Sequence, residues 1–197
     1  MKKAKFTRAR RYPPRTPYKS CNVDRTDKYI TVVSEENWGG KYFSRHGLVV
    51  HSLRNVTPKW LGENVRKALE SSEYYAPPAG IPIDQQQRIA MEEKSTERRL
   101  TFWDEIARTY GYKSRELAWK KKDHVFISWF YKSEPDIEIL SSKSSVTGNH
   151  SAWPLDINED RVFLIPFTAS DEEIGEMVLK ALAKCEGPGK STEPLFP

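Results

Sequence analysis

Two segments far apart in this chain have the pattern of one and the same helix. They are TPKWLGENVRKALESS, which begins at Thr57, and SDEEIGEMVLKALAKC, which begins at Ser170. Each starts with a hydroxyl residue that can cap the first turn and continues with apolar residues at helical spacing. Both contain Gly-Glu at the same position, with glycines Gly62 and Gly175. A glycine inside a helix costs about 1 kcal/mol relative to alanine, so the pattern predicts close backbone packing, which we expect against a sheet.

The segments before the two helices also correspond. Residues 28–34 (KYITVVS), 42–43 and 48–53 (LVVHSL) precede the first helix, and residues 124–131 (HVFISWFY), 136–140 (DIEIL) and 161–167 (RVFLIPF) precede the second. Their β-branched and aromatic residues are typical of strands, and Gly39-Gly40 supplies a turn. We therefore predict an α/β (α+β) protein with an antiparallel or mixed sheet. Two related sheet-plus-helix halves, about 28–73 and 124–185, would pack into one globule.

The segment between the halves has its own signals. The prolines of APPAGIPIDQQQ (76–87) predict a loop, because proline cannot donate a backbone hydrogen bond. TFWDEIARTYGY then predicts a helix that Thr101 caps and Gly111 ends, and SRELAWK predicts a short helix capped by Ser114.

Composition bounds the class of protein. With 197 residues, 38% hydrophobic and 30% charged, the chain is typical of a globular protein, and we expect a single domain over 20–185. It has neither an apolar run of membrane-spanning length nor a secretory signal, so we expect a cytoplasmic protein. Cys21 and Cys185 lack metal-ligand spacing and are expected to be reduced, structural thiols. Glycines and prolines in 186–197 predict a flexible tail.

Positive charge is concentrated at the N-terminus. Residues 1–19 contain eight Lys or Arg and no acid, whereas acidic residues outnumber basic ones in the rest of the chain. One interpretation is a disordered, solvated arm that Pro13, Pro14 and Pro17 keep extended. The other is an arm that binds nucleic acid, because clustered Lys and Arg release the counterions of phosphate groups.

Several of these segments together resemble a known family. The first sheet-and-helix half, TFWDEIARTYGYKSRELAWK, DIEI and above all SDEEIGEMVLKALAKC are similar to the immunity proteins of bacterial contact-dependent growth inhibition systems. The resemblance covers about 28–185. It implies a protein of bacterial competition that is not an enzyme, needs no cofactor and neutralises the C-terminal domain of a cognate toxin, often a nuclease.

An acidic segment is the candidate for such an interface. Between Glu134 and Asp160 the chain has six acids and one base, Lys143, and the alternation in DIEIL would place Asp136 and Glu138 on one solvent-facing side. An acidic surface suits a nuclease, whose active cleft is basic. The candidate toxin-binding residues are Glu134, Asp136, Glu138, Trp153, Asp156, Glu159 and Asp160. The alternative is an ordinary solvated edge with Trp153 packed inward.

Catalysis has weak support. His46 and His51 could in principle serve acid-base chemistry, but the chain has no zinc motif, nucleophile elbow or phosphate-binding glycine loop. Aromatic and basic residues mix only in 126–132, a weak sign of base stacking. We therefore predict stoichiometric inhibition of a toxin by surface occlusion. Nucleic-acid binding through the arm is the alternative, and a hydrolase ranks below both.

Overall fold

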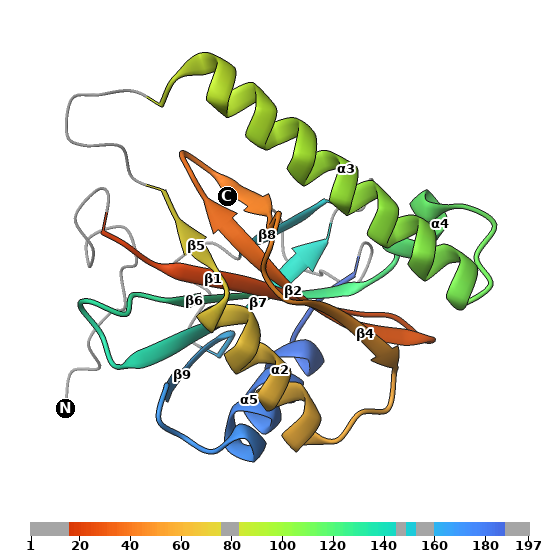
Figure 1. The fold of residues 1–197 in the computed structure, drawn as a ribbon. Coiled ribbons are helices and arrows are strands. Elements are labelled where there is room, and N and C mark those ends of the chain that lie inside the picture. The colour runs from red at the N-terminus through yellow and green to blue at the C-terminus, as the bar shows by residue number, and fades with distance from the viewer. Residues whose placement is uncertain (1–15, 76–82, 145–148, 153–159, 188–197) are drawn as a thin grey trace, which may run out of the picture.

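A curled sheet lies between two layers of helices (Figure 1). The computed structural model describes residues 16–75, 83–144, 149–152 and 160–187. Helices α2 and α5 cover one face of the sheet, and α3 and α4 lie over the other. Among the described residues, no helix is both long enough and apolar enough to cross a membrane. The mixture of helices and antiparallel strands confirms the predicted α+β class.

We define two halves by their order of elements. The first half comprises β1 (Lys19–Arg25), β2 (Tyr29–Asn37), β3 (Lys41–Phe43), β4 (Val49–Leu53) and α2 (Pro58–Glu70). The second comprises β6 (Asp123–Trp129), β7 (Asp136–Ser144), β8 (His150–Ala152), β9 (Val162–Pro166) and α5 (Asp171–Ala183). Between them lie β5 (Glu73–Tyr74), α3 (Gln85–Thr109) and α4 (Arg115–Lys120).

Corresponding elements of the two halves have equal lengths. The two members of each pair have 7 residues in β1 and β6, 9 in β2 and β7, 3 in β3 and β8, 5 in β4 and β9, and 13 in α2 and α5. The prediction from sequence began the first half at residue 28 and placed Lys19 in the arm, so it missed β1. This strand mixes polar residues with only two buried apolar ones, Cys21 and Val23.

Strand registers are also the same in both halves. Cys21 pairs with Ser34 in the first half, and Val125 pairs with Ser141 at the same strand positions in the second. The hydroxyl of Ser34 donates to the carbonyl of Ala68 over 2.9 Å, and that of Ser141 donates to the carbonyl of Ala181 over 2.7 Å. Each hydrogen bond joins the same strand position to the same helix position, so the two halves repeat one arrangement in detail.

The halves share one sheet instead of forming two small ones. β1 and β6 pair antiparallel at its centre, from Lys19 opposite Trp129 to Arg25 opposite Asp123. Outward from this pair, β2 carries β3, β4 and the two-residue β5, and β7 carries β8 and β9. β4 and β9 therefore lie at opposite edges of one continuous sheet.

The repeated glycines pack helix against helix, and the expected contact with the sheet is wrong. A Cβ on Gly62 would lie 1.7 Å from the carbonyl oxygen of Asp171, and a Cβ on Gly175 would lie 1.8 Å from that of Pro58. These carbonyls belong to the first residue of each opposite helix. The helices therefore cross so closely that only glycine fits at the crossing.

Most helix boundaries follow the expected capping. Thr57, Ser114 and Ser170 cap α2, α4 and α5, and Ser170 forms a capping box with Glu173. Gly39 and Gly111 adopt positive φ, at the turn after β2 and just beyond α3. These predictions are confirmed.

Helix α3 begins far earlier than predicted. Asp84 caps it by accepting a hydrogen bond from the backbone of Gln87, so Gln85–Gln87 are helical and not part of a loop. Thr101 lies inside the helix, where its hydroxyl donates to the carbonyl of Glu97. Threonine can make this internal hydrogen bond as well as cap, so the sequence signal was ambiguous. The prolines between 76 and 82 lie outside the described residues.

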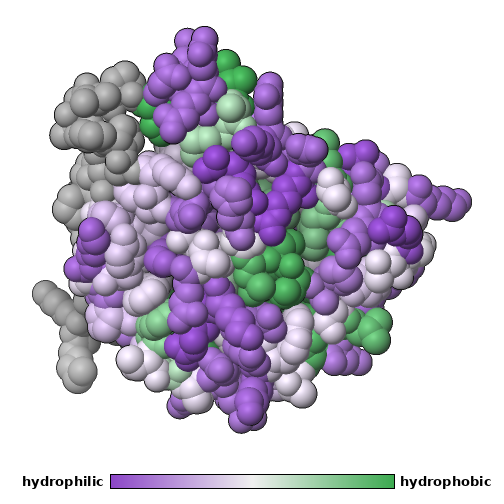
Figure 2. Space-filling view, viewed as in Figure 1, coloured by the Kyte–Doolittle hydropathy of each residue, from purple (hydrophilic) through white to green (hydrophobic). Residues whose placement is uncertain are grey.

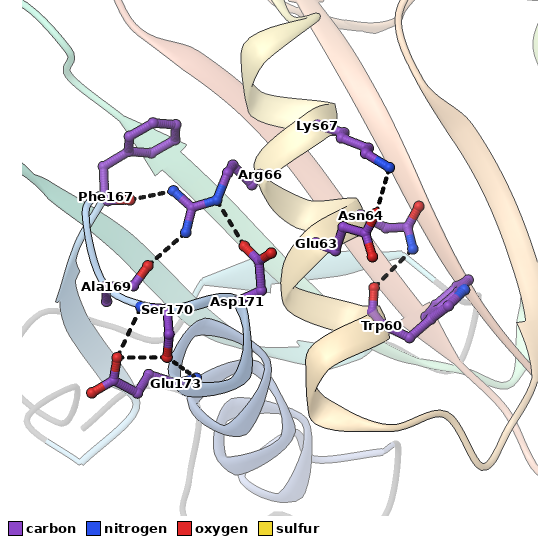
Figure 3. Close-up of polar contacts among 10 residues, drawn as sticks. All are labelled: Trp60, Glu63, Asn64, Arg66, Lys67, Phe167, Ala169, Ser170, Asp171 and Glu173. Carbon is purple, nitrogen blue, oxygen red and sulfur yellow. Dashed lines mark hydrogen bonds and ion pairs between the residues drawn. The ribbon is translucent and has the colours of Figure 1, made fainter.

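Arg66 fastens the start of α5 to α2. Its guanidinium lies 2.7 Å from Asp171, donates to the carbonyls of Phe167 and Ala169, and stands over the ring of Phe167 (Figure 3). On the same helix, Lys67 pairs with Glu63, one turn away (Figure 3). A depression between the N-terminal parts of α2 and α5 is lined by residues of both charges. They are the basic Lys59 and Arg66 and the acidic Asp171 and Glu172.

Candidate functional site

Of the acidic residues expected from the sequence, those that the structure describes do not form one open patch. Glu134 and Asp136 are half-buried at the start of β7, whereas Glu138 is only 2% exposed. The expectation that Asp136 and Glu138 share a solvent-facing side is therefore wrong for Glu138. Alternation exposes a strand face only at an open surface, and both faces of β7 are largely buried at this point. Trp153, Asp156 and Glu159 lie outside the described residues.

Asp160 is exposed but compensated by positive charge. Its carboxylate lies 3.1 Å from Arg161 and 2.9 Å from Lys184. The hydrogen bond from Lys184 lowers the pKa of Asp160, and the charge of Arg161 acts in the same direction. Arg161 also pairs with Glu186, whose backbone bonds to Ser142 and Ser144. Glu186 is thus attached to β7, although the sequence placed it in the flexible tail.

The strand face that lies under α3 and α4 differs between the two halves. In the first half, an aromatic cluster under α3 and α4 uses Tyr29, Val33, Phe43 and Val49 from the strands. The same positions in the second half hold Asp136, Leu140, Ala152 and Val162. On the strand face that α3 and α4 cover in the first half, Asp136 therefore replaces Tyr29 and Ala152 replaces Phe43, whereas Leu140 and Val162 remain apolar.

An exposed leucine lies beside these acids. Leu164 on β9 pairs with Glu138 on β7, and Asp136 pairs with Pro166 in the same ladder. Residues at alternate positions share a face, so Asp136, Leu164 and Pro166 lie on one side of this sheet edge. Leu164 is 40% exposed, whereas its counterpart His51 contacts Tyr110 at the end of α3. We call Asp136, Leu164 and Pro166, together with Glu134 two residues before Asp136 in the chain, the β9 edge surface.

A buried charge cluster was not found from the sequence. Asp24 on β1 lies 2.6 Å from Lys122 and 2.5 Å from Nδ1 of His124 on β6. The ring of His150 on β8 lies 4.9 Å from that of His124 and within 3.0 Å of the Ser142 hydroxyl. Register brings them together because Asp24 pairs directly with His124. From the sequence, His124 is only the first residue of the predicted strand 124–131.

The cluster shifts the pKa values of its members. Burial alone would raise the pKa of Asp24, but Lys122 and His124 outweigh burial and hold it well below its usual range. Burial, together with His124 and Lys122, lowers the pKa of His150 to about 3. His150 is therefore neutral near pH 7, while Asp24 stays ionised. The arrangement ties the two central strands together.

The histidines considered for catalysis are separated. His46 lies exposed after β3, whereas Nδ1 of His51 is 2.9 Å from the Tyr110 hydroxyl and Nε2 is 3.3 Å from Glu105. Cys21 and Cys185 are free thiols in the structure. Burial raises the pKa of both. In the described part of the chain, no three His, Cys, Asp or Glu side chains are grouped as metal ligands.

The family follows from a match that spans nearly the whole described structure. The sequence profile of the CDI immunity protein family, CdiI, matches residues 19–185. The chain belongs to this family. The match begins at the first residue of β1 and ends just after α5, so it includes both halves and α3 and α4. The resemblance inferred from the sequence motifs is confirmed.

Two solved structures are similar to this chain in fold. A protein of unknown function from Neisseria meningitidis, NMB0488, has a TM-score of 0.70 at 18% identity and covers 89% of this chain and 99% of its own. A CdiA-CT/CdiI toxin and immunity complex from Yersinia pseudotuberculosis has a TM-score of 0.72 at 20% identity, covering 86% of this chain and 98% of that one. No curated protein sequence matches this chain.

Proposed function

We propose that this immunity protein binds and neutralises a cognate contact-dependent growth inhibition toxin domain by covering part of its surface, in equal stoichiometry and without chemistry of its own. Membership of the CdiI family carries this proposal, and the neighbouring fold from Yersinia pseudotuberculosis was solved as a toxin and immunity complex. The toxin is a nuclease in this proposal. An acidic contact surface fits the basic cleft that a nuclease needs to hold phosphate.

The β9 edge surface is the proposed contact. It combines two half-buried acids, Glu134 and Asp136, with the exposed side chain of Leu164. Acids at an interface mainly raise the association rate, whereas an apolar residue that becomes buried mainly slows dissociation. Asp160 contributes less because Arg161 and Lys184 already compensate its charge. Glu138 is not part of the proposed contact, because its side chain is buried.

The test measures binding of the toxin domain encoded beside this chain. In the variant Glu134→Lys/Asp136→Lys, we expect association to slow roughly tenfold or more at low salt and less at high salt. Leu164→Asp should instead raise the dissociation rate. Leu53→Asp is the matched control, because Leu53 is 70% exposed on β4, the counterpart of β9. Glu176→Lys controls for charge on the exposed side of α5.

The outcomes separate the function from the surface. Absence of toxin binding and of protection against the toxin by the unaltered chain would refute the immunity function. Tight binding that neither Glu134→Lys/Asp136→Lys nor Leu164→Asp weakens would keep the function and exclude the β9 edge surface. A toxin without nuclease activity that is still bound would remove only the nuclease part.

A further inference from the structure

Strand β4 lies at one edge of the sheet, where β2 is its strand partner in the described part of the chain (Figure 1). In an antiparallel pair, alternate residues direct their backbone groups toward the partner strand, and the residues between direct theirs away. The N–H of Arg54 donates to the carbonyl of Lys28 on β2 over 3.1 Å, so the even-numbered residues of β4 face β2. Val49, His51 and Leu53 therefore direct their N–H and C=O groups outward.

These outward backbone groups are open to a further strand. Among the described residues, none forms a backbone hydrogen bond with the outward groups of Val49, His51 or Leu53. The side chain of Leu53 is 70% exposed. Figure 2 shows hydrophobic surface along β4, and no grey atoms cover it in this view. An edge of this kind is a template for pairing with another strand.

The opposite edge of the sheet is partly blocked. The N–H of Ser141 on β7 donates to the carbonyl of Arg161 over 3.0 Å, so the even-numbered residues of β9 face outward. Pro166 is one of them and has no N–H, and its carbonyl accepts from the N–H of Ala169 over 3.0 Å. Pro166 occupies the position in β9 that Leu53 occupies in β4. A proline protects an edge strand from pairing, and β4 lacks one.

We propose that β4 pairs with β4 of a second copy of this chain, antiparallel about a two-fold axis at His51. In this register His51 lies opposite His51 of the second copy, and Val49 lies opposite Leu53. Every outward N–H and C=O group of the three residues then has a partner, because they are evenly spaced about the axis. Residues at alternate positions share a face, so the exposed Leu53 packs beside Val49 of the second copy.

The symmetric pairing suits this edge better than pairing with β9 of another copy. A β4–β9 contact would set Pro166 against the outward groups of β4 and leave some of them without a partner. It would also extend from copy to copy without closing, whereas the two-fold pairing ends at a dimer. In the dimer both β9 edges lie at the outer ends of one joined sheet. The inference therefore leaves the proposed toxin contact open and does not depend on it.

The test is sedimentation velocity of the full chain over a series of concentrations up to roughly 0.1 mM. We expect a change from monomer to dimer as concentration rises, and no larger species, because the pairing uses both β4 edges. Leu53→Pro introduces at β4 the residue that blocks β9. It removes an N–H that the folded chain does not use, so the dissociation constant of the dimer should rise about tenfold or more.

A matched pair of leucines separates this contact from a general effect of apolar surface. Leu53→Ala should weaken the dimer without any change of backbone, so it also serves if proline disturbs the strand. Leu117→Ala should leave the dimer unchanged, because Leu117 is 52% exposed on α4, away from the β4 edge.

A cysteine at the axis tests the register. Residues of a hydrogen-bonded antiparallel pair have Cα atoms about 5.5 Å apart, which is within reach of a disulfide. His51→Cys should therefore form a disulfide-linked dimer under mild oxidation. Ser52→Cys should not, because Ser52 lies opposite Val50 of the second copy and not opposite its own equivalent. The unaltered chain controls for its own free thiols, Cys21 and Cys185.

Three outcomes would overturn the proposal. The first is a chain that stays monomeric at every concentration, which would leave β4 for a strand of another protein or for none. The second is a dimer that neither Leu53→Pro nor Leu53→Ala weakens, or that Leu117→Ala weakens equally. The third is a dimer in which His51→Cys forms no disulfide between copies, since the contact would then lie elsewhere or in another register.

Discussion

Gly62 and Gly175 face each other across the crossing of α2 and α5, and each lies against the first carbonyl of the opposite helix. The relationship is reciprocal, because the same position in each half makes the same contact. It explains why both helices tolerate a residue that weakens an isolated helix. The close approach brings both helices down onto the same sheet face, where Leu61, Val65, Ile174 and Val178 are buried.

Alanine at either glycine should destabilise the protein. The added Cβ would meet backbone at less than 2 Å, so the helices must separate, and overpacking of this kind costs about 1–3 kcal/mol or more. We expect Gly62→Ala and Gly175→Ala each to lower the thermal unfolding midpoint by several degrees. Glu176→Ala, at the exposed neighbouring position, is the control. If both glycine variants unfold at the same temperature as Glu176→Ala, the two helices can separate without loss of stability, which would contradict this prediction.

Arg66 should be needed for the junction between β9 and α5. Its guanidinium bonds to Asp171, Phe167 and Ala169 at once. Arg66→Ala should therefore cost roughly 2–3 kcal/mol in denaturant unfolding. Lysine keeps the charge but cannot reach three acceptors, so Arg66→Lys should recover only part of the loss. Lys67→Ala should change little, because Lys67 lies at the surface. A full recovery by Arg66→Lys would contradict the role of the fork geometry.

The stability that the buried Asp24–Lys122 ion pair gives the fold should depend on both of its charges. Asp24→Asn leaves Lys122 buried without its carboxylate, and breaking a buried pair in this way costs about 3–5 kcal/mol. Lys122→Met leaves the opposite charge, which His124 still contacts. The double variant removes both charges and should be more stable than the sum of the single losses predicts. A double-mutant cycle in urea measures this coupling, and additive losses would show that the two residues act independently.

Stability should fall on the acid side of neutrality because of His150. An unfolded histidine binds a proton below about pH 6.5, whereas His150 in the folded protein does so only near pH 3. Proton uptake therefore favours the unfolded chain as pH falls through this window, and stability at pH 7 is unaffected. Asp24, Lys122 and His124 face this side of the sheet and are present both in the unaltered protein and in the variant that tests this dependence.

The variant His150→Asn tests this dependence. Its amide can still bond to the Ser142 hydroxyl, but it takes up no proton. The urea midpoint of the unaltered protein should drop between pH 7 and pH 4 more than that of the variant. Parallel curves would show that His150 does not contribute to the acid dependence.

The sequence by itself determined the local elements. Caps at Thr57 and Ser170, the glycine turn after β2 and the strands with alternating or continuous apolar residues were all readable, because each depends on neighbours within a few residues. The repeated helix also indicated two related halves. The family resemblance came from such local motifs, above all the one that begins at Ser170.

Only the tertiary structure decided which residues meet. The helix crossing at Gly62, the pairing of Asp24 with Lys122 and the burial of Glu138 all depend on strand register and on how layers stack. The alternation of acidic and apolar residues along β7 is the same in the sequence whether the acidic face of the strand is covered or open to solvent. Contacts between residues about a hundred positions apart leave no trace in local periodicity, because the free energy that fixes them comes from packing of the whole sheet.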